Sequence, residues 1–212
     1  MDSNNIINNN NNDFDIIIKL IIIGDSGVGK SNYLYRFVEG GFSPIHVATL
    51  GFDYKSKVCY LPKAKKKVKF QIWDTAGQEK YMSVNKNLFQ RVQGIILMYD
   101  ISFEKSFENL DNWLNAIRQL ADGIPLILIG NKIDLENERK ISKEKGEQFS
   151  HDNNIDFFES SGKSGVNVEE SFIFLGEEIL RLNKNIEKQS IGGNEYVISK
   201  ETTYDKKKKK CC

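Results

Sequence analysis

Short apolar runs alternate with amphipathic segments along most of the chain. Buried strands are predicted at the apolar runs 16–23, 68–73, 94–99, 124–129 and 155–158. Apolar positions recur with helical spacing between these runs, which predicts helices near 30–39, 104–120, 142–152 and 168–182. This alternation is typical of an α/β fold, in which helices cover both faces of a mostly parallel sheet.

The alternation is interrupted between Phe52 and Trp73. Two strand-like pieces flank the lysine-rich residues 61–67 there, and no helix separates them. A hairpin fits this pattern, so we expect a sheet of six strands with one antiparallel edge strand. The lysines are interpreted as solvated charge on an exposed loop, with a membrane or partner contact as the alternative.

Both ends of the chain differ in composition from its middle. Residues 4–12 contain seven asparagines in nine positions, and the last residues carry a lysine run. Such segments bury little apolar surface. We therefore expect residues 1–13 to be a disordered Asn-rich segment, residues 14–183 to form one domain and residues 184–212 to form a flexible tail.

Charge and cysteine usage exclude several classes of protein. The 30 basic and 29 acidic residues nearly cancel, so no nucleic-acid partner is expected. Cys59 lies in a predicted strand, whereas Cys211 and Cys212 are the last two residues, which suggests no disulfide framework and an intracellular protein. The start has neither a signal sequence nor a myristoylated glycine, and no apolar run reaches the length of a membrane span.

The segment Gly24–Ser31 fits the phosphate-loop pattern G-x-x-x-x-G-K-[ST] directly after the predicted strand 16–23. Its glycines allow backbone N–H groups to turn toward phosphate oxygens. Lys30 adds a charge for the β- and γ-phosphates, and Ser31 offers a hydroxyl to Mg²⁺. A chance match in a glycine-bearing turn is the alternative, and the placement after a strand argues against it. The candidate phosphate-binding residues are Gly24, Asp25, Ser26, Gly27, Val28, Gly29, Lys30, Ser31 and Asn32.

Further candidate residues follow two other predicted strands. Asp74 comes directly after the strand ending at Trp73 and is expected to hold Mg²⁺ through a water. In the same segment Gly77 can bring its N–H against a γ-phosphate, and Gln78 can orient a water for in-line attack. Gln78, Lys30 and Gly77 are therefore the candidate catalytic residues.

The segment Asn131-Lys132-Ile133-Asp134 follows the strand that ends at Gly130. Asp134 would accept hydrogen bonds from guanine N1–H and the 2-amino group, which adenine lacks at those positions, so adenine would leave a buried carboxylate unpaired. Lys132 can lay its aliphatic stem along the base. Alone this tetrapeptide indicates only a turn, but after a phosphate loop and a DTAGQ segment it indicates guanine binding.

In this order and spacing, the motifs resemble those of the Ras superfamily of small GTPases, and most closely the Rab family, over roughly residues 14–182. The residues that resemble Rab sequences are the blocks at 14–15, 73–79 and 98–102, Trp113 and the terminal Cys-Cys. The resemblance implies that Thr49 ligates Mg²⁺ and senses the γ-phosphate, and that Phe42 covers the edge of the guanine ring. It also implies a base-binding loop in which Ser161 supports Asp134, the Gly162 N–H meets guanine O6 and Lys163 covers the base. Asn131 is counted with the guanine-binding residues.

The chain departs from the usual family pattern at several positions. Ser26 is common among Rab proteins, whereas Ala48 removes a hydroxyl beside Thr49 and Lys80 replaces an arginine. His46 is interpreted as a loop histidine rather than a catalytic or pH-sensing group. Residues 88–91 replace a Tyr-Tyr-Arg-Gly segment, so the surface that partners would contact differs.

The C-terminus ends in five lysines followed by Cys211 and Cys212. The resemblance implies that both cysteines carry geranylgeranyl groups, which together with the lysines would give stable anchoring to an anionic leaflet. Two unmodified thiols on a merely electrostatic tail are the alternative.

The resemblance implies a monomeric GTPase that binds GTP, GDP and Mg²⁺ and acts in vesicle and membrane traffic. It would work at the cytoplasmic face of a membrane, with a soluble cytosolic pool. Expected partners are effectors, an exchange factor, an activating protein, and prenylation escort and dissociation-inhibitor proteins. One alternative is an interaction module that binds the nucleotide with little or no hydrolysis. Another is an ATP-dependent kinase or ATPase, against which Asn131, Lys132 and Asp134 argue.

Overall fold

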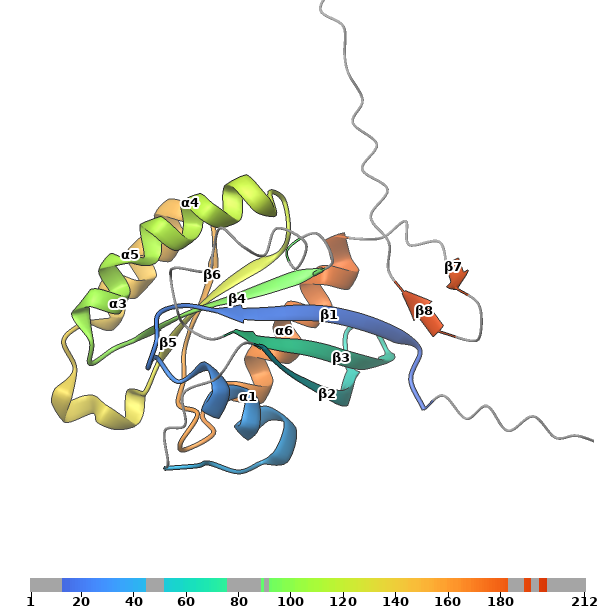
Figure 1. Cartoon of the computed structure of the whole chain (residues 1–212), viewed down its shortest axis with the longest axis horizontal. Coiled ribbons are helices and arrows are strands. Elements are labelled where there is room, and N and C mark those ends of the chain that lie inside the picture. The colour runs from blue at the N-terminus through green and yellow to red at the C-terminus, as the bar shows by residue number, and fades with distance from the viewer. Residues whose placement is uncertain are drawn as a thin grey trace, which may run out of the picture.

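A mostly parallel sheet runs through the computed structural model, which describes residues 13–44, 52–75, 89, 92–182, 189–191 and 195–197 (Figure 1). Its central path has the order β2-β3-β1-β4-β5-β6. The bounds are Ile16–Ile23 for β1, Phe52–Leu61 for β2, Lys66–Thr75 for β3, Gly94–Asp100 for β4, Leu126–Asn131 for β5 and Asp156–Glu159 for β6. Along this path only β2 and β3 pair antiparallel. The predicted sheet of six strands with one antiparallel edge strand is confirmed.

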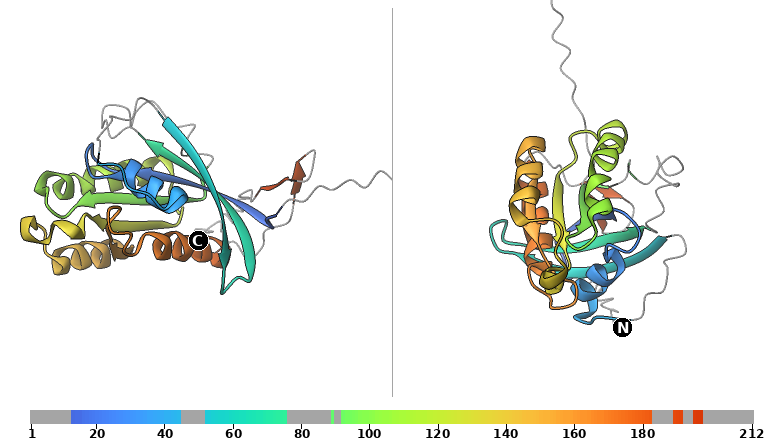
Figure 2. Two further views of the ribbon diagram at one scale, coloured as in Figure 1. Left: turned by 90° about the horizontal axis from the view of Figure 1, so that it is seen from below. Right: turned by 90° about the vertical axis from the view of Figure 1, so that its left-hand side faces the viewer.

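Helices cover both faces of this sheet (Figure 2). Helices α1 (Lys30–Glu39) and α6 (Val168–Leu182) pack on one face, where their apolar residues join those of the sheet in one buried cluster. Helices α3 (Glu104–Glu108), α4 (Leu110–Leu120) and α5 (Lys143–Asn153) lie on the other face, over a second cluster. The predicted arrangement of layers is confirmed.

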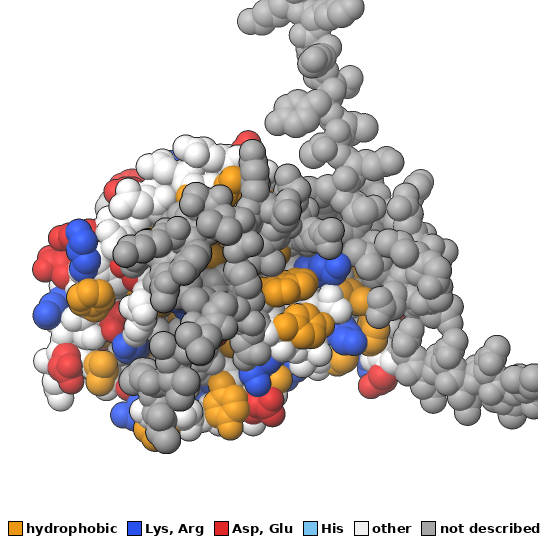
Figure 3. Space-filling view, viewed as in Figure 1, with side chains coloured by type: hydrophobic (Ala, Val, Ile, Leu, Met, Phe, Trp, Pro, Cys, Tyr) orange, Lys and Arg blue, Asp and Glu red, His pale blue; other side chains and the backbone are white. Residues whose placement is uncertain are grey.

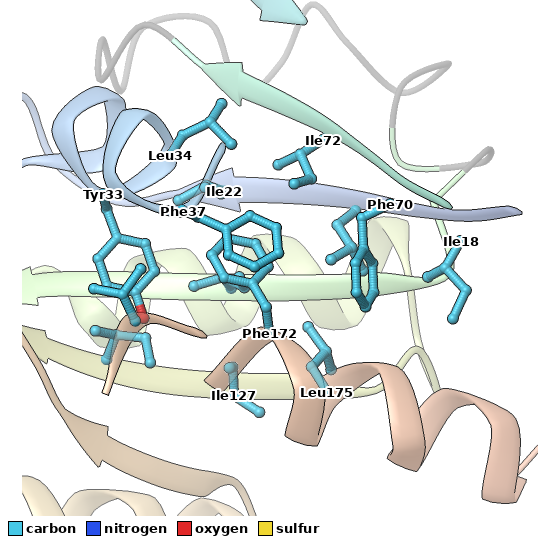
Figure 4. Packing of buried hydrophobic residues seen from close by; sticks show 14 of the residues in the cluster. Ile18, Ile22, Tyr33, Leu34, Phe37, Phe70, Ile72, Ile127, Phe172 and Leu175 are labelled. Atoms are coloured by element: carbon cyan, nitrogen blue, oxygen red, sulfur yellow. The ribbon is translucent and has the colours of Figure 1, made fainter. Parts of the chain in front are cut away.

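The central strand β1 is apolar on both faces because each face lies under helices. Leu20 and Ile22 belong to the cluster under α1 and α6, whereas Ile21 and Ile23 belong to the cluster on the α4 side. The core under α1 and α6 contains stacked aromatic rings, as Figure 4 shows; the ring centroids of Phe37 and Phe172 lie 3.8 Å apart.

The structure differs from the sequence prediction at three places. The helix predicted over 104–120 is interrupted at Asn109 and forms α3 and α4. A 3₁₀ helix, η2 (Ile133–Glu138), follows β5 where only a turn was expected. Within the predicted tail, β7 (Gln189–Ile191) and β8 (Glu195–Val197) pair with each other, and β8 pairs with β1 at Ile17.

The hairpin lysines are partly engaged in ion pairs. Lys63 lies 3.5 Å from Glu177 of α6, and Lys67 lies 2.6 Å from Asp13. Three large hydrophobic residues of β2 remain exposed, Tyr54, Val58 and Tyr60. The view in Figure 3 shows hydrophobic side chains exposed beside lysines and arginines on the molecular surface.

Cys59 points into the core from β2. Only 8% of its surface is exposed, and burial raises the pKa of its thiol to about 11. Within the part of the chain that the structure describes, no helix combines the length and the apolar character needed to cross a bilayer.

We predict that Phe172→Ala lowers the free energy of unfolding by about 3–5 kcal/mol, because the ring is fully buried and stacks on Phe37. Phe103→Ala is the matched control, since Phe103 is 46% exposed, and it should cost less than about 1 kcal/mol. Urea unfolding measures both. Similar costs for the two variants would contradict this description of the core.

Candidate functional site

The loop between β1 and α1 approaches neighbouring atoms so closely that glycine is required. Gly24 has a φ of 139°, and a Cβ there would lie 2.2 Å from the carbonyl oxygen of Met98 on β4. Gly29 has a φ of 98°, and a Cβ there would lie 2.6 Å from Nδ2 of Asn131. The glycine pattern therefore serves both the left-handed backbone and the close packing of the loop.

Lys30 and Ser31, at the start of α1, face the loop and the end of β3. The buried Lys30 ammonium donates hydrogen bonds to the carbonyl oxygens of Gly24 and Asp25, both at 2.8 Å. The Ser31 hydroxyl donates to Asp74 Oδ2 at 2.5 Å. The structure thus brings together a cation for phosphates and two of the three predicted magnesium ligands.

The residues present fit Mg²⁺. This ion prefers oxygen ligands, and protein sites often supply only one or two side chains while phosphates and waters complete the shell. Ser31 and Asp74 supply a hydroxyl and a carboxylate oxygen beside the phosphate loop. The third predicted ligand, Thr49, lies outside the described residues.

Asn131, at the end of β5, connects two loops through its buried side-chain amide. Its Nδ2 donates to the Val28 carbonyl oxygen at 2.8 Å, and its Oδ1 accepts from the Gly162 N–H at 3.1 Å. The Gly162 N–H, which the resemblance assigns to guanine O6, is thus bonded to Asn131 in this structure. Its contact with the base stays a prediction.

Lys132 lies across the phosphate loop. Its ammonium donates to the Gly27 carbonyl oxygen at 2.7 Å and pairs with Asp100 Oδ2 at 2.7 Å. Asp100 ends β4 and is buried. The Lys132 ammonium is therefore held between the phosphate loop and the end of β4. The contact of its aliphatic stem with the base stays a prediction.

Asp134 and the loop after β6 form a second group of contacts. The Ser161 hydroxyl donates to Asp134 Oδ1 at 2.6 Å, and the Lys163 ammonium lies 3.7 Å from Asp134 Oδ2. Ser161 Oγ in turn accepts from the backbone N–H groups of Lys163 and Ser164. The structure thus places Ser161 against Asp134, as the resemblance implies, and holds the carboxylate in a fixed position. The contact of Lys163 with the base stays a prediction.

Sequence reasoning missed Arg36 of α1. Its guanidinium donates to the carbonyl oxygens of Gly162, Lys163 and Gly40. No sequence signal marked it, because an arginine on an amphipathic helix usually faces water. In the structure it links α1 to the loop after β6, in which Gly162 also bonds to Asn131.

Arg139 was also missed. It forms two hydrogen bonds with the Glu159 carboxylate, at 2.5 Å and 3.1 Å, and two with Glu136. These contacts raise the pKa of the Arg139 guanidinium and lower the pKa of the Glu136 carboxyl. The ion pair with Glu159 joins the end of η2 to the end of β6, and so fixes the two segments that carry Asp134 and Ser161.

Asn32 and Phe42 lie at the other side of the loop. The Asn32 amide exchanges two hydrogen bonds with the backbone of Ser43, at 3.0 Å and 3.1 Å. This pairing holds the half-buried Phe42, one residue earlier, close to the start of α1. The phosphate contact of Asn32 and the base contact of Phe42 stay predictions.

Several predicted residues lie outside the described part of the chain. They are Thr49, Gly77, Gln78, Cys211 and Cys212, together with His46, Ala48 and Lys80. Of the segment 88–91 only Phe89 is described, and it is buried.

The described candidates gather at one edge of the sheet. Asp74 and Asn131 lie at the carboxyl ends of β3 and β5, and the phosphate loop and the loop after β6 follow the carboxyl ends of β1 and β6. This edge is where open α/β sheets bind ligands. It offers backbone N–H groups and a lysine for phosphates, oxygen ligands for a cation, and a fixed carboxylate.

Comparisons with known proteins agree with this geometry. The family model described as Ras family matches residues 19–181. Ras-related protein Rab-13 of Rattus norvegicus is 43% identical over 168 residues, which cover 79% of this chain and 82% of that protein. Ras-related protein Rab-8 of Diplobatis ommata is 42% identical over 180 residues, covering 84% and 85% of the two chains. Rab-10 of the same organism is 43% identical over 169 residues, covering 79% and 84%.

We predict that Ser161→Ala weakens the binding of guanine nucleotides by about tenfold or more, because it removes a hydrogen bond to a carboxylate. The matched control is Ser164→Ala: the Ser164 side chain is exposed, and its contact with Ser161 is made by its backbone N–H, which the substitution keeps. Competition titration with a fluorescent guanine nucleotide measures both. Equal affinities for the two variants would show that Ser161 does not support Asp134.

Proposed function

The chain belongs to the Ras family, with Rab proteins among its relatives, and is a GTPase; we propose that it alternates between GDP-bound inactive and GTP-bound active states to regulate membrane traffic. The observation that carries this proposal is the convergence of the phosphate loop, the Ser31–Asp74 pair and the Asp134–Ser161 pair at one edge of the sheet. Each of these groups matches one part of a magnesium-bound guanine nucleotide.

Guanine selectivity would come from Asp134. Its Oδ1 is already bonded to Ser161, so the carboxylate is held in place before the base arrives. Guanine offers two N–H donors at the edge that such a carboxylate can accept. Adenine offers none there, so the carboxylate would lose hydrogen bonds that water gives it and gain none from the base, and this cost would exclude adenine.

Phosphate binding would rest on Lys30 and the loop. The Lys30 ammonium, now bonded to two loop carbonyls, lies where it can exchange these contacts for phosphate oxygens. Bound Mg²⁺, held by Ser31 with Asp74 nearby, would neutralise charge that develops on the phosphates. Thr49, Gly77 and Gln78 would add a magnesium ligand, a γ-phosphate contact and a water-orienting amide; these roles rest on the resemblance.

Hydrolysis is expected to be slow without an activating protein. The chain contains five arginines. In the described part, Arg36, Arg118, Arg139 and Arg181 are bonded to partners other than the phosphate loop. An arginine supplied by a partner would add about 10³–10⁵ in rate.

The C-terminal tail would anchor the protein. We propose that Cys211 and Cys212 carry prenyl groups and that the lysines at 206–210 each add about 1 kcal/mol of attraction to an anionic leaflet. The anchored protein would act at the cytoplasmic face of a membrane. Effectors would bind its GTP state, and exchange, activating and escort proteins would control its cycle.

We predict that Gln78→Leu slows single-turnover hydrolysis of GTP by at least about tenfold, since the attacking water loses its orienting group. The purified parent should carry GDP or GTP and bind GTP in preference to ATP. Gln148→Leu, an exposed substitution on α5, is the matched control and should hydrolyse GTP like the parent. Nucleotide binding without turnover in the parent would instead favour the interaction module.

We also predict that the parent, expressed in cells, is found in the membrane fraction with two prenyl groups on its last residues. A Cys211→Ser/Cys212→Ser variant should remain in the soluble fraction. Intact-mass measurement of the C-terminal peptide decides this, because an unmodified peptide in the membrane fraction would rule out the lipid anchor.

A further inference from the structure

The phosphate loop contains a carboxylate that is bonded to a helix. Asp25 is 3% exposed. Its Oδ1 accepts a hydrogen bond from Trp113 Nε1 at 2.8 Å, and its Oδ2 accepts one from Asn109 Nδ2 at 2.6 Å. Both donors come from the amino-terminal turn of α4, which packs on the sheet face opposite α1 and α6.

The two donors share one face of α4 because they are four residues apart. The Trp113 backbone N–H donates to the Asn109 carbonyl oxygen at 3.2 Å, which closes this first turn. Asn109 precedes α4, where an asparagine would ordinarily cap the helix, yet its side chain makes no capping hydrogen bond and is used on Asp25. Trp113 is 4% exposed in the core. The Asp25 carboxylate thus accepts hydrogen bonds from two donors whose positions are fixed by the helix and the core.

A carboxylate is an unexpected group in a loop that receives phosphates, since like charges repel. Two N–H donors and the positive end of the α4 dipole stabilise it here. The backbone carbonyl of the same residue accepts a hydrogen bond from the Lys30 ammonium at 2.8 Å. Asp25 therefore has two links: its side chain is bonded to α4, and its backbone carbonyl is bonded to Lys30, the cation that would contact the phosphates.

We propose that Asp25 is a positioning residue: its two hydrogen bonds to α4 hold the phosphate loop and Lys30 in the arrangement that binds the β-phosphate of a guanine nucleotide. This inference rests on the proposed function. A loop already held in its binding shape loses little conformational freedom when the ligand arrives. A loop released from α4 would lose that freedom on binding, so the diphosphate would be released faster.

The test compares GDP with GMP, because GMP lacks the β-phosphate but keeps the base. Asn109→Ala and Trp113→Phe each remove one donor, and Phe preserves most of the ring packing. Each should accelerate GDP dissociation by about tenfold and lower the ratio of GDP affinity to GMP affinity by a similar factor. Asp25→Ala removes both bonds and should lower this ratio further.

Asp25→Asn is the conservative variant that separates geometry from charge. Its amide oxygen can still accept from Trp113, and its amide NH₂ can donate to Asn109 if the Asn109 amide turns over. It should keep the ratio of GDP to GMP affinity within about threefold of the parent. Asn115→Ala, an exposed substitution on the same helix, is the matched control and should leave both affinities unchanged.

The outcomes distinguish this proposal from the proposed function. A parent that does not prefer GDP to ADP overturns the proposed function itself. If the parent binds GDP but the Asn109 and Trp113 variants lose GDP and GMP affinity equally, or lose only thermal stability, the bonds are structural and the positioning role is wrong. Asn109 is half-buried, so its variant gives a result even if Trp113→Phe fails to fold.

Discussion

The burial of β1 on both faces is the constraint on which the other features of the fold depend. Its side chains alternate between two apolar clusters, so the strand must lie in the middle of the sheet with helices above and below it. This central position places β1 between β3 and β4, which both pair with it. It also brings the loop at the carboxyl end of β1 against Met98 of β4. A substitution that disturbs β1 would therefore displace the phosphate loop without touching any residue in it.

Fixed contacts between loops, rather than the strands alone, give the site its shape. Asn131 bonds the phosphate loop to the loop after β6, and Arg36 bonds that second loop to α1. The Asp25 carboxylate adds two hydrogen bonds between the phosphate loop and α4, which lies on the sheet face opposite α1 and α6. Hydrogen bonds thus connect the loop that would bind the phosphates to the loop that would bind the base. A nucleotide that binds to one loop finds the other already in position.

The sequence was most informative where local pattern and burial act together. Five apolar runs predicted five of the six central strands, and the hairpin pattern between Phe52 and Trp73 predicted the sixth. The order of motifs indicated that Ser31 and Asp74 share a magnesium site, and the resemblance implied that Ser161 supports Asp134. The use of the Asn109 side chain could not be predicted, since its partner is the carboxylate of Asp25, 84 residues earlier in the chain. Arg36 and Arg139 were missed for the same reason. Their hydrogen-bond partners belong to other elements, and the spacing of residues along one element does not indicate such distant partners.

The pairing of β8 with Ile17 places the described part of the C-terminal tail far from the phosphate loop. Ile17 lies near the start of β1 and Ile23 at its end, so six residues of strand, about 20 Å, separate the last described C-terminal segment from the phosphate loop. If the tail leads to a bilayer, this length of β1 lies between the nucleotide edge and the described part of the tail. A regulator that binds at the nucleotide edge would then contact the opposite end of β1 from the one at which β8 pairs.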